Sequence, residues 1–372
     1  MVVTVPSAVA APSPADNPLT KKIEDPLIPI GYGKRELTSF EKYRLKKTIA
    51  DLEKAARAEL DRGNTDRAMK LWYRQLKLAR AVGRDLEVKT LGQVGEIAWQ
   101  ENRSNDVRNI AERTIAIQSQ AESENTLADS LLNRFATVYQ QIRYLDRAID
   151  IYQQIVANHK QADTDVKYED LRQLGQLYLG IFDYQNAAKI YQQLLDKSTD
   201  KDRQMLDYKT LIDIYERSQQ FDRAIQARKR LIEQYSQAQL TNLIPAIEIA
   251  IAQDYEALKQ TNRAIKAYQR AVTTATTNQQ LALASNAIEG IARLYLQQNK
   301  TDKAISTYIQ SIDIQQQSYD YYGVMDTYDT LGQIYLESDR KDLAQQYFQR
   351  ALDLAKALNY KVEYFNSRIK QI

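Results

Sequence analysis

Few side chains in this sequence could carry out catalysis or hold a transition metal. His159 is the only histidine, and the chain has no cysteine. The common zinc and iron sites need several His or Cys ligands, so this composition excludes them, and His159 is expected to be a solvated residue of a polar loop. The glycine-rich phosphate loops and the nucleophile elbow of hydrolases are also missing. We therefore expect a protein that is not an enzyme and has no resident cofactor.

One stretch rich in aspartate and tyrosine, residues 313–329, is the remaining candidate for binding a cation. Hard cations such as calcium and manganese prefer carboxylate oxygens, which makes them the candidates for such a site. The favoured interpretation is nevertheless packing between helices together with solvated charge. The candidate metal ligands are Asp313, Asp320, Asp326 and Asp329, interleaved with Tyr319, Tyr321, Tyr322 and Tyr328.

The overall composition is that of an ordinary globular chain with few helix breakers. Hydrophobic residues make up 44% of the chain and charged residues 27%. The formal net charge of +3 is too small to indicate a nucleic-acid partner, and no apolar run reaches the length of a membrane span. Six of the seven prolines lie within the first 30 residues. The remainder is therefore predicted to be almost continuous helix, an all-α fold.

The stretch Tyr168–Asp196 shows how these helices should pair. Its two halves each carry apolar residues at spacings of three and four, separated by a break at residues 180–186. That spacing is the 3.6-residue period of two amphipathic helices. The break is long enough only to reverse the chain, so the helices should pack antiparallel as a hairpin. Gly175 and Ala187 are expected at the crossing point, because small side chains let two backbones approach closely.

The same pattern recurs in register along the chain. A small residue returns about every 40 positions, another lies twelve positions before it, and a tyrosine follows the latter by three in six successive units. These columns resemble the tetratricopeptide repeat, with its W-x2-L-G-x2-Y and A-x3-F pattern. Gly175, Tyr178 and Ala187 carry the match above, although a leucine replaces the Trp. The first column is Ala68, Val107, Ala148, Ala187, Ala224, Ala264, Ala304 and Ala344.

The resemblance implies a right-handed superhelical solenoid of about eight hairpins. We expect a disordered or extended proline-rich segment over residues 1–38, the solenoid over residues 39–359 and a C-terminal capping helix over residues 360–372. The spacing exceeds the usual 34 residues, so the additional residues should lengthen helices or lie in loops. In the fifth unit Ile212 and Arg228 replace a small and an aromatic residue, which predicts a splayed hairpin.

The resemblance also implies where a partner binds. In this family the first helix of each hairpin lines a concave groove. The groove expected here is mixed in charge but rich in Arg and Lys, and arginine forks suit carboxylates such as the acidic end of a peptide. Ordinary solvation of a wide groove is the alternative interpretation. The expected groove residues are Asn133, Arg134, Arg172, Gln176, Lys209, Asp213, Arg217, Glu289, Arg293, Asp329 and Gln333.

The first residues suggest where the protein acts. Ala8–Ala11 followed by Pro-Ser-Pro resembles the end of a signal peptide and the start of an exported chain. We therefore expect the remnant of a signal peptide and a periplasmic or exported protein. The glutamine-rich repeats resemble those of cyanobacterial PratA-like proteins, which are periplasmic factors of photosystem II assembly. That resemblance implies binding of the D1 precursor and a link to manganese supply.

The leading functional hypothesis is a non-enzymatic scaffold or assembly factor that holds a segment of a partner protein in the groove. A rigid solenoid presents a long surface at little conformational cost on binding. The partner is expected to be a protein or peptide, including a segment of a membrane protein, and not a nucleic acid. The alternative is a cytoplasmic regulator or adaptor that binds a peptide or a transcription factor.

Overall fold

The structure of the chain is a computed structural model that describes residues 17–161 and 167–372. Within these residues the regular elements are helices and no strand occurs, so the all-α prediction is confirmed. Two compact units divide the chain, Met1–Ile190 and Tyr191–Ile372. None of the helices in the described part combines the length and the apolar character that crossing a membrane requires.

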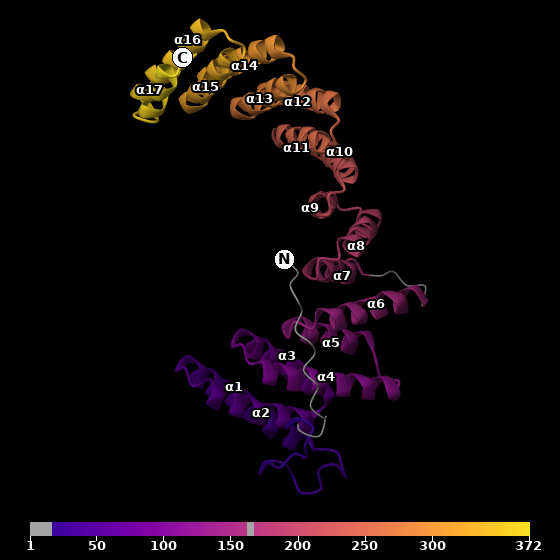
Figure 1. Cartoon of the computed structure of the whole chain (residues 1–372). Helices are drawn as coiled ribbons and strands as arrows, with labels where there is room; N and C mark the ends of the chain where they lie inside the picture. The colour runs from indigo at the N-terminus through magenta and orange to yellow at the C-terminus, as the bar shows by residue number, and fades with distance from the viewer. Residues whose placement is uncertain (1–16, 162–166) are drawn as a thin grey trace, which may run out of the picture. The chain divides into compact units, whose positions relative to one another are not determined.

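The helices of the first unit follow one another as hairpins (Figure 1). The packed pairs are α1 with α2, α3 with α4, and α5 with α6. The boundary between the two units falls within α8 (Tyr184–Lys197). The remaining elements are α1 (Ser39–Asp61), α2 (Thr65–Val82), α3 (Arg84–Gln100), α4 (Ser104–Ser123), α5 (Asp129–Gln141), α6 (Leu145–Gln161) and α7 (Tyr168–Gly180).

The second unit continues the same alternation and ends in a short helix. Its packed pairs are α9 with α10, α11 with α12, α13 with α14, and α15 with α16, while α17 packs on α16. The elements are α9 (Lys201–Arg217), α10 (Phe221–Gln237), the 3-10 turn η2 (Thr241–Leu243), α11 (Ile244–Ala257), α12 (Thr261–Thr277), α13 (Leu281–Gln297), α14 (Thr301–Gln317), α15 (Tyr321–Glu337), α16 (Lys341–Ala357) and α17 (Val362–Lys370).

The columns of small residues lie where the helices cross. Ala68, Ala264 and Ala344 of the second-helix column are completely buried. In α15, a Cβ added at Gly332 would lie 2.7 Å from the Phe348 ring on α16. Close approach of the two backbones therefore requires a small residue at these positions, as the sequence pattern predicts.

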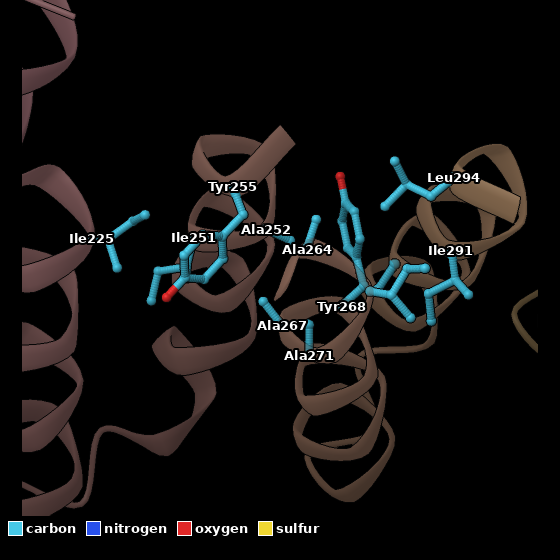
Figure 2. Close-up of a cluster of buried hydrophobic side chains, with 12 residues drawn as sticks. Ile225, Ile251, Ala252, Tyr255, Ala264, Ala267, Tyr268, Ala271, Ile291 and Leu294 are labelled. Atoms are coloured by element: carbon cyan, nitrogen blue, oxygen red, sulfur yellow. The ribbon is translucent and has the colours of Figure 1, made fainter. Parts of the chain in front are cut away.

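Aromatic residues fill the space beside each crossing. Tyr268 on α12 is 2% exposed and belongs to a core cluster shared with α11 and α13. Figure 2 shows its ring between Ala264 on one side and Leu294 on the other. The ring also packs so closely on α13 that a Cβ at Gly290 would lie 2.6 Å from it. Tyr268 thus joins the hairpin of α11 and α12 to α13.

The residues beyond the usual repeat length extend the helices. Helices α12 to α16 each span 17 residues, and only short turns separate them. In the fifth unit α9 and α10 still pack against each other. There the aromatic position is taken by buried Arg228, which donates hydrogen bonds to Asp254 and to Glu216.

Residues 17–38 pack against the first unit, and residues 1–16 lie outside the described part. Leu19 and Leu37 are buried. The first helix begins at Ser39 as expected, but its cap is Thr38, whose Oγ1 accepts a hydrogen bond from the Glu41 N–H at 3.2 Å. This N-terminal segment is therefore attached to the helices by both apolar burial and capping.

The prediction for His159 is wrong. The residue lies within α6 rather than in a loop, and its side chain is only 15% exposed. Its Nε2 atom is 3.6 Å from Oδ2 of Asp129 on α5. The helix continues through this polar run, whose composition is also typical of a loop.

Candidate functional site

A cavity of about 540 Å³ lies in the second unit among three consecutive first helices. These helices, α11, α13 and α15, contribute most of its wall, and Tyr268, Tyr308 and Gln315 reach it from the intervening second helices. Asp320 borders it from the turn before α15. The first-helix residues that carry the site are Ile249, Gln253, Asn286, Glu289, Arg293, Asp326, Thr327 and Thr330.

A hydrogen-bonded chain holds Glu289 in the cavity wall. Its Oε1 accepts hydrogen bonds from Gln315 Nε2 at 2.7 Å and from Ser285 Oγ at 3.3 Å. The other end of the Gln315 amide, Oε1, accepts from Thr327 Oγ1 at 3.1 Å. Burial raises the pKa of Glu289, and the neighbouring Asp320 carboxylate adds to the shift. The cavity therefore contains a fixed carboxyl group that would gain from a cation nearby.

Arg293 is already neutralised by a carboxylate of the preceding first helix. Its Nη1 and Nη2 atoms lie 2.7 and 3.0 Å from the two oxygens of Glu256. The Tyr268 hydroxyl donates a further hydrogen bond to Glu256, at 2.6 Å. The hydrogen bond to Glu256 is also the main reason why the pKa of Arg293 is raised. This bidentate pairing uses the fork that we expected to bind a partner's carboxylate.

The helix α17 engages the polar residues of α15. Lys361 Nζ lies 3.0 Å from Oδ1 of Asp326, and the Tyr364 hydroxyl donates to Asp329 at 2.9 Å. Arg368 donates to Oε1 of Gln333 and lies 3.6 Å from Asp329. Asp329 and Gln333, two expected groove residues, are therefore in contact with the capping helix.

The four aspartates proposed as metal ligands have separate surroundings. Asp320 accepts a hydrogen bond from the Gly323 N–H at 2.9 Å and so caps α15. Asp326 and Asp329 contact α17, whereas Asp313 is exposed on α14. Across residues 17–161 and 167–372, no group of three His, Cys, Asp or Glu side chains is arranged as a metal ion would need.

The other expected groove residues lie on first helices, several of them bound to their own helix. Asn133 Nδ2 donates to the Asp129 carbonyl at 3.1 Å, and Arg217 Nε lies 2.8 Å from Asp213. Arg134 lies 3.8 Å from Asp85. On α7 are Arg172 and Gln176, and on α9 is Lys209, whose Nζ lies 5.7 Å from the centre of the Tyr235 ring.

The cavity brings together Glu289 and Arg293 from the expected set and adds residues that we did not predict. Asn286 and Asp326 hold the same place in α13 and α15, six residues before Ala292 and Gly332, and that rule could have identified them. Tyr268 and Gln315 lie on second helices. No first-helix pattern could have found these two.

Comparison with known proteins identifies the repeats. A family model, "Tetratricopeptide repeat", matches residues 282–357, which correspond to α13–α16. No curated protein matches the chain.

Several solved structures are similar in part. BtubC (BKLC) from P. vanneervenii is 19% identical over 58% of this chain and 92% of its own, with a TM-score of 0.38. The C-terminal part of a TPR repeat-containing protein from Cytophaga hutchinsonii is 15% identical over 70% of this chain and 94% of its own, with a TM-score of 0.41. MamA is 20% identical over 53% and 94%, with a TM-score of 0.37. Residues 282–357 therefore match the tetratricopeptide repeat family.

Proposed function

We propose that this chain is a non-enzymatic scaffold that binds a segment of a partner protein at the cavity of α11, α13 and α15. The main support is that three consecutive first helices contribute polar side chains to one cavity. Helices held by buried crossings lose little conformational entropy on binding, so most of the interaction energy remains available for affinity. The same surface offers no paired nucleophile and base, which argues for binding rather than catalysis.

The charges of the cavity favour a partner with a Lys or Arg side chain. Glu289, Asp320 and Asp326 line it, and Asp326 is paired with Lys361. The lining cation Arg293 is paired with Glu256, so Glu289 and Asp320 are the carboxylates that a partner's cation would face. A cationic side chain beside Glu289 would offset the cost of burying that carboxylate. This preference is the reverse of the carboxylate ligand that the arginine-rich groove suggested.

The titration of Glu289 gives the binding a pH dependence. Burial raises the pKa of this group in the free protein, and a bound cation would lower that pKa by favouring the charged form. Binding therefore releases a proton, and affinity should increase as the pH rises through the titration range of Glu289.

The experiment is affinity purification of the tagged full chain from the cells that produce it. The variant Glu289→Gln with Asp326→Asn removes two cavity charges, and Asp302→Asn with Asp342→Asn removes two exposed charges elsewhere in the same unit. Partners recovered by the wild-type chain and by the control should be lost with the cavity variant. Equal recovery by both variants would show that the cavity does not bind the partner.

Two finer hypotheses rest on the sequence resemblance alone. Export is supported by Ala8–Ala11 and the prolines that follow, which lie outside the described residues; fractionation of the native protein would find it in the periplasm. Photosystem II assembly, with the D1 precursor as partner, is supported by the glutamine-rich repeats. Calorimetric titration with manganese tests the metal part, and no heat of binding would remove it.

A further inference from the structure

A second hollow in the same unit lies between two second helices. It has a volume of about 840 Å³ and is bounded by α10 and α12, with α11 between them. Ile225, Ile251 and Tyr255 form an apolar part of its wall, and Figure 2 shows Ile225 of α10 facing the other two on α11. We call this hollow the α10–α12 cleft. Most of its wall comes from second helices, and it shares no lining residue with the cavity of α11, α13 and α15.

The first unit has a cleft at the equivalent place. This α2–α4 cleft has a volume of about 540 Å³. The column of small residues aligns Ala68 of α2 with Ala224 of α10. In that register, five α2 residues that line the first cleft correspond to five α10 residues that line the second. The pairs are Asp66 and Asp222, Met69 and Ile225, Lys70 and Gln226, Tyr73 and Lys229, and Lys77 and Glu233.

A segment of this chain forms part of the wall of the α2–α4 cleft and contacts both helices. Residues 17–25 join the two helices: Asn17 Nδ2 donates to the Asn109 carbonyl of α4 at 2.7 Å, and Arg74 Nε of α2 donates to Asp25 Oδ2 at 2.7 Å. Leu19 between them is 3% exposed, and Arg80 donates to its carbonyl at 3.2 Å. The segment thus combines an apolar anchor, backbone carbonyls bound by arginine, and a carboxylate.

Four cationic side chains line the α10–α12 cleft, the same number as in the α2–α4 cleft. Lys229, Lys266 and Arg270 are exposed at its edge, and Arg263 lies beside them. Neither lysine forms an ion pair with any residue that the structure describes. In the α2–α4 cleft Arg74 is bound to Asp25, whereas here Arg270 Nε lies 3.7 Å from Glu248. This cleft therefore has cationic groups that an acidic segment could engage.

An unsatisfied polar atom lies in the same wall. The side chain of Glu248 is only 9% exposed, and its Oε2 has no hydrogen-bond partner among the described residues. A buried oxygen without a donor is costly, and a backbone N–H or a hydroxyl placed in the cleft would remove that cost. An extended peptide offers such N–H groups because its backbone is not engaged in a helix.

We propose that the α10–α12 cleft binds an extended segment of a partner protein that carries an apolar residue followed by one or two carboxylates. The apolar residue packs on Ile225 and Ile251. The carboxylates pair with Lys266 and Arg270 of α12, whereas Asp25 pairs with Arg74 of α2 in the first cleft. This surface adds a second binding site to the chain and does not depend on the cavity of α11, α13 and α15.

The probe is a fluorescein-labelled peptide, PLTQQIEDPLI, which is residues 18–28 with Lys21→Gln and Lys22→Gln. Its neutral counterpart, PLTQQIQNPLI, lacks the two carboxylates. Fluorescence anisotropy with the full chain should show the acidic peptide binding about tenfold more tightly than the neutral one. Equal affinity of the two peptides would overturn the proposal.

Charge reversal locates the site. Lys266→Glu with Arg270→Glu should weaken binding of the acidic peptide by about tenfold. The matched control is Lys189→Glu with Lys303→Glu, two exposed lysines on other second helices, and it should bind as the wild type does. Equal binding by the two double variants would place the peptide elsewhere and overturn the proposal.

Two further measurements test whether the peptide binds instead at the cavity of α11, α13 and α15, and whether the cleft is occupied by a second copy of this chain. Glu289→Gln with Asp326→Asn should leave peptide affinity unchanged, since that variant tests the other cavity. Light scattering after size exclusion tests whether the occupant is a second copy of this chain. A dimer that Lys266→Glu with Arg270→Glu abolishes would replace the proposed partner with the N-terminal segment of another copy.

Discussion

Arg228 occupies the position where most other second helices carry an aromatic ring. Its side chain is 6% exposed and donates hydrogen bonds to Asp254 and Glu216. A buried guanidinium requires such partners, because an unpaired charge in the interior is strongly destabilising. Burial raises the pKa of Asp254 to about 6, even though Arg228 acts in the opposite direction. The stability of the second unit should therefore depend on the protonation of this group of three charges.

Replacing Asp254 with Asn should change how stability depends on pH. The folded-state pKa of about 6 exceeds the ordinary value of 3.8, so the native state binds the proton more tightly than the unfolded state does. The stability that this group contributes is full below about pH 4 and is lost as the pH rises towards 6. Urea denaturation at several pH values should therefore show the wild type losing stability relative to Asp254→Asn across that window.

The control for this experiment is an exposed carboxylate of the same unit. Asp302→Asn removes an exposed carboxylate of the same unit and reports what the loss of one surface charge does to stability at each pH. A wild-type advantage over Asp254→Asn that grows with pH in this window would mean that the ion pair with Arg228, rather than burial, dominates the energetics of Asp254.

The turns between helices share a left-handed residue whose side chain varies. Asn299 and Asp339 have φ angles of 56° and are residue types that tolerate this conformation. Phe182, in the turn between α7 and α8, has φ 62° and is 71% exposed. Its ring lies 6.4 Å from that of Tyr184, measured between ring centroids. A bulky side chain at this position costs about 1–2 kcal/mol relative to an unstrained backbone.

Phe182→Asn should therefore stabilise the first unit by about 1 kcal/mol. The relief of backbone strain exceeds the loss of a mostly solvent-exposed ring contact. Chemical denaturation of the purified full chain measures the change. The reciprocal variant Asn299→Phe should destabilise the second unit by a similar amount, and a loss of stability in Phe182→Asn would show that the exposed ring makes a structural contact.

The repeating columns could be predicted from the sequence because a steric requirement sets them. A crossing such as that of Gly332 and Phe348 leaves no space for a larger residue, so a small residue recurs at a constant spacing. The partners of polar residues could not be predicted in the same way. Arg293 pairs with Glu256 on the preceding first helix, and that pairing depends on the rotation of one helix relative to the next.

Two other features could not be predicted because the same amino-acid composition is compatible with two different structures. The polar run after Asn158 has the composition of a loop, yet α6 continues to Gln161. Residues 17–25 have no helical period, and the same property describes a disordered tail and a segment bound in a cleft. Contacts with distant residues distinguish these cases, such as the hydrogen bond from Arg74 to Asp25, 49 positions apart in the chain.

At the scale of the whole molecule, packing connects helices that are neighbours in the chain. The most extensive contacts in each unit are between consecutive helices, such as α1 with α2 and α15 with α16. Such an array has no single core, and its stability is approximately a sum over repeats and the interfaces between neighbours. A defect in one repeat should therefore remain local, which distinguishes this fold from a globular domain of equal length.

Phe348→Ala tests this locality. The ring is fully buried, touches Gly332 and lies 4.8 Å from the guanidinium carbon of Arg368, so its removal should cost about 3–5 kcal/mol. Hydrogen exchange followed by mass spectrometry should show faster exchange in α15–α17 and unchanged exchange in α1–α6. The exposed neighbour Gln349→Ala should leave exchange unchanged throughout. If Phe348→Ala accelerated exchange equally in every helix, the chain would unfold as one cooperative body, and the additive description by repeats would be wrong for this protein.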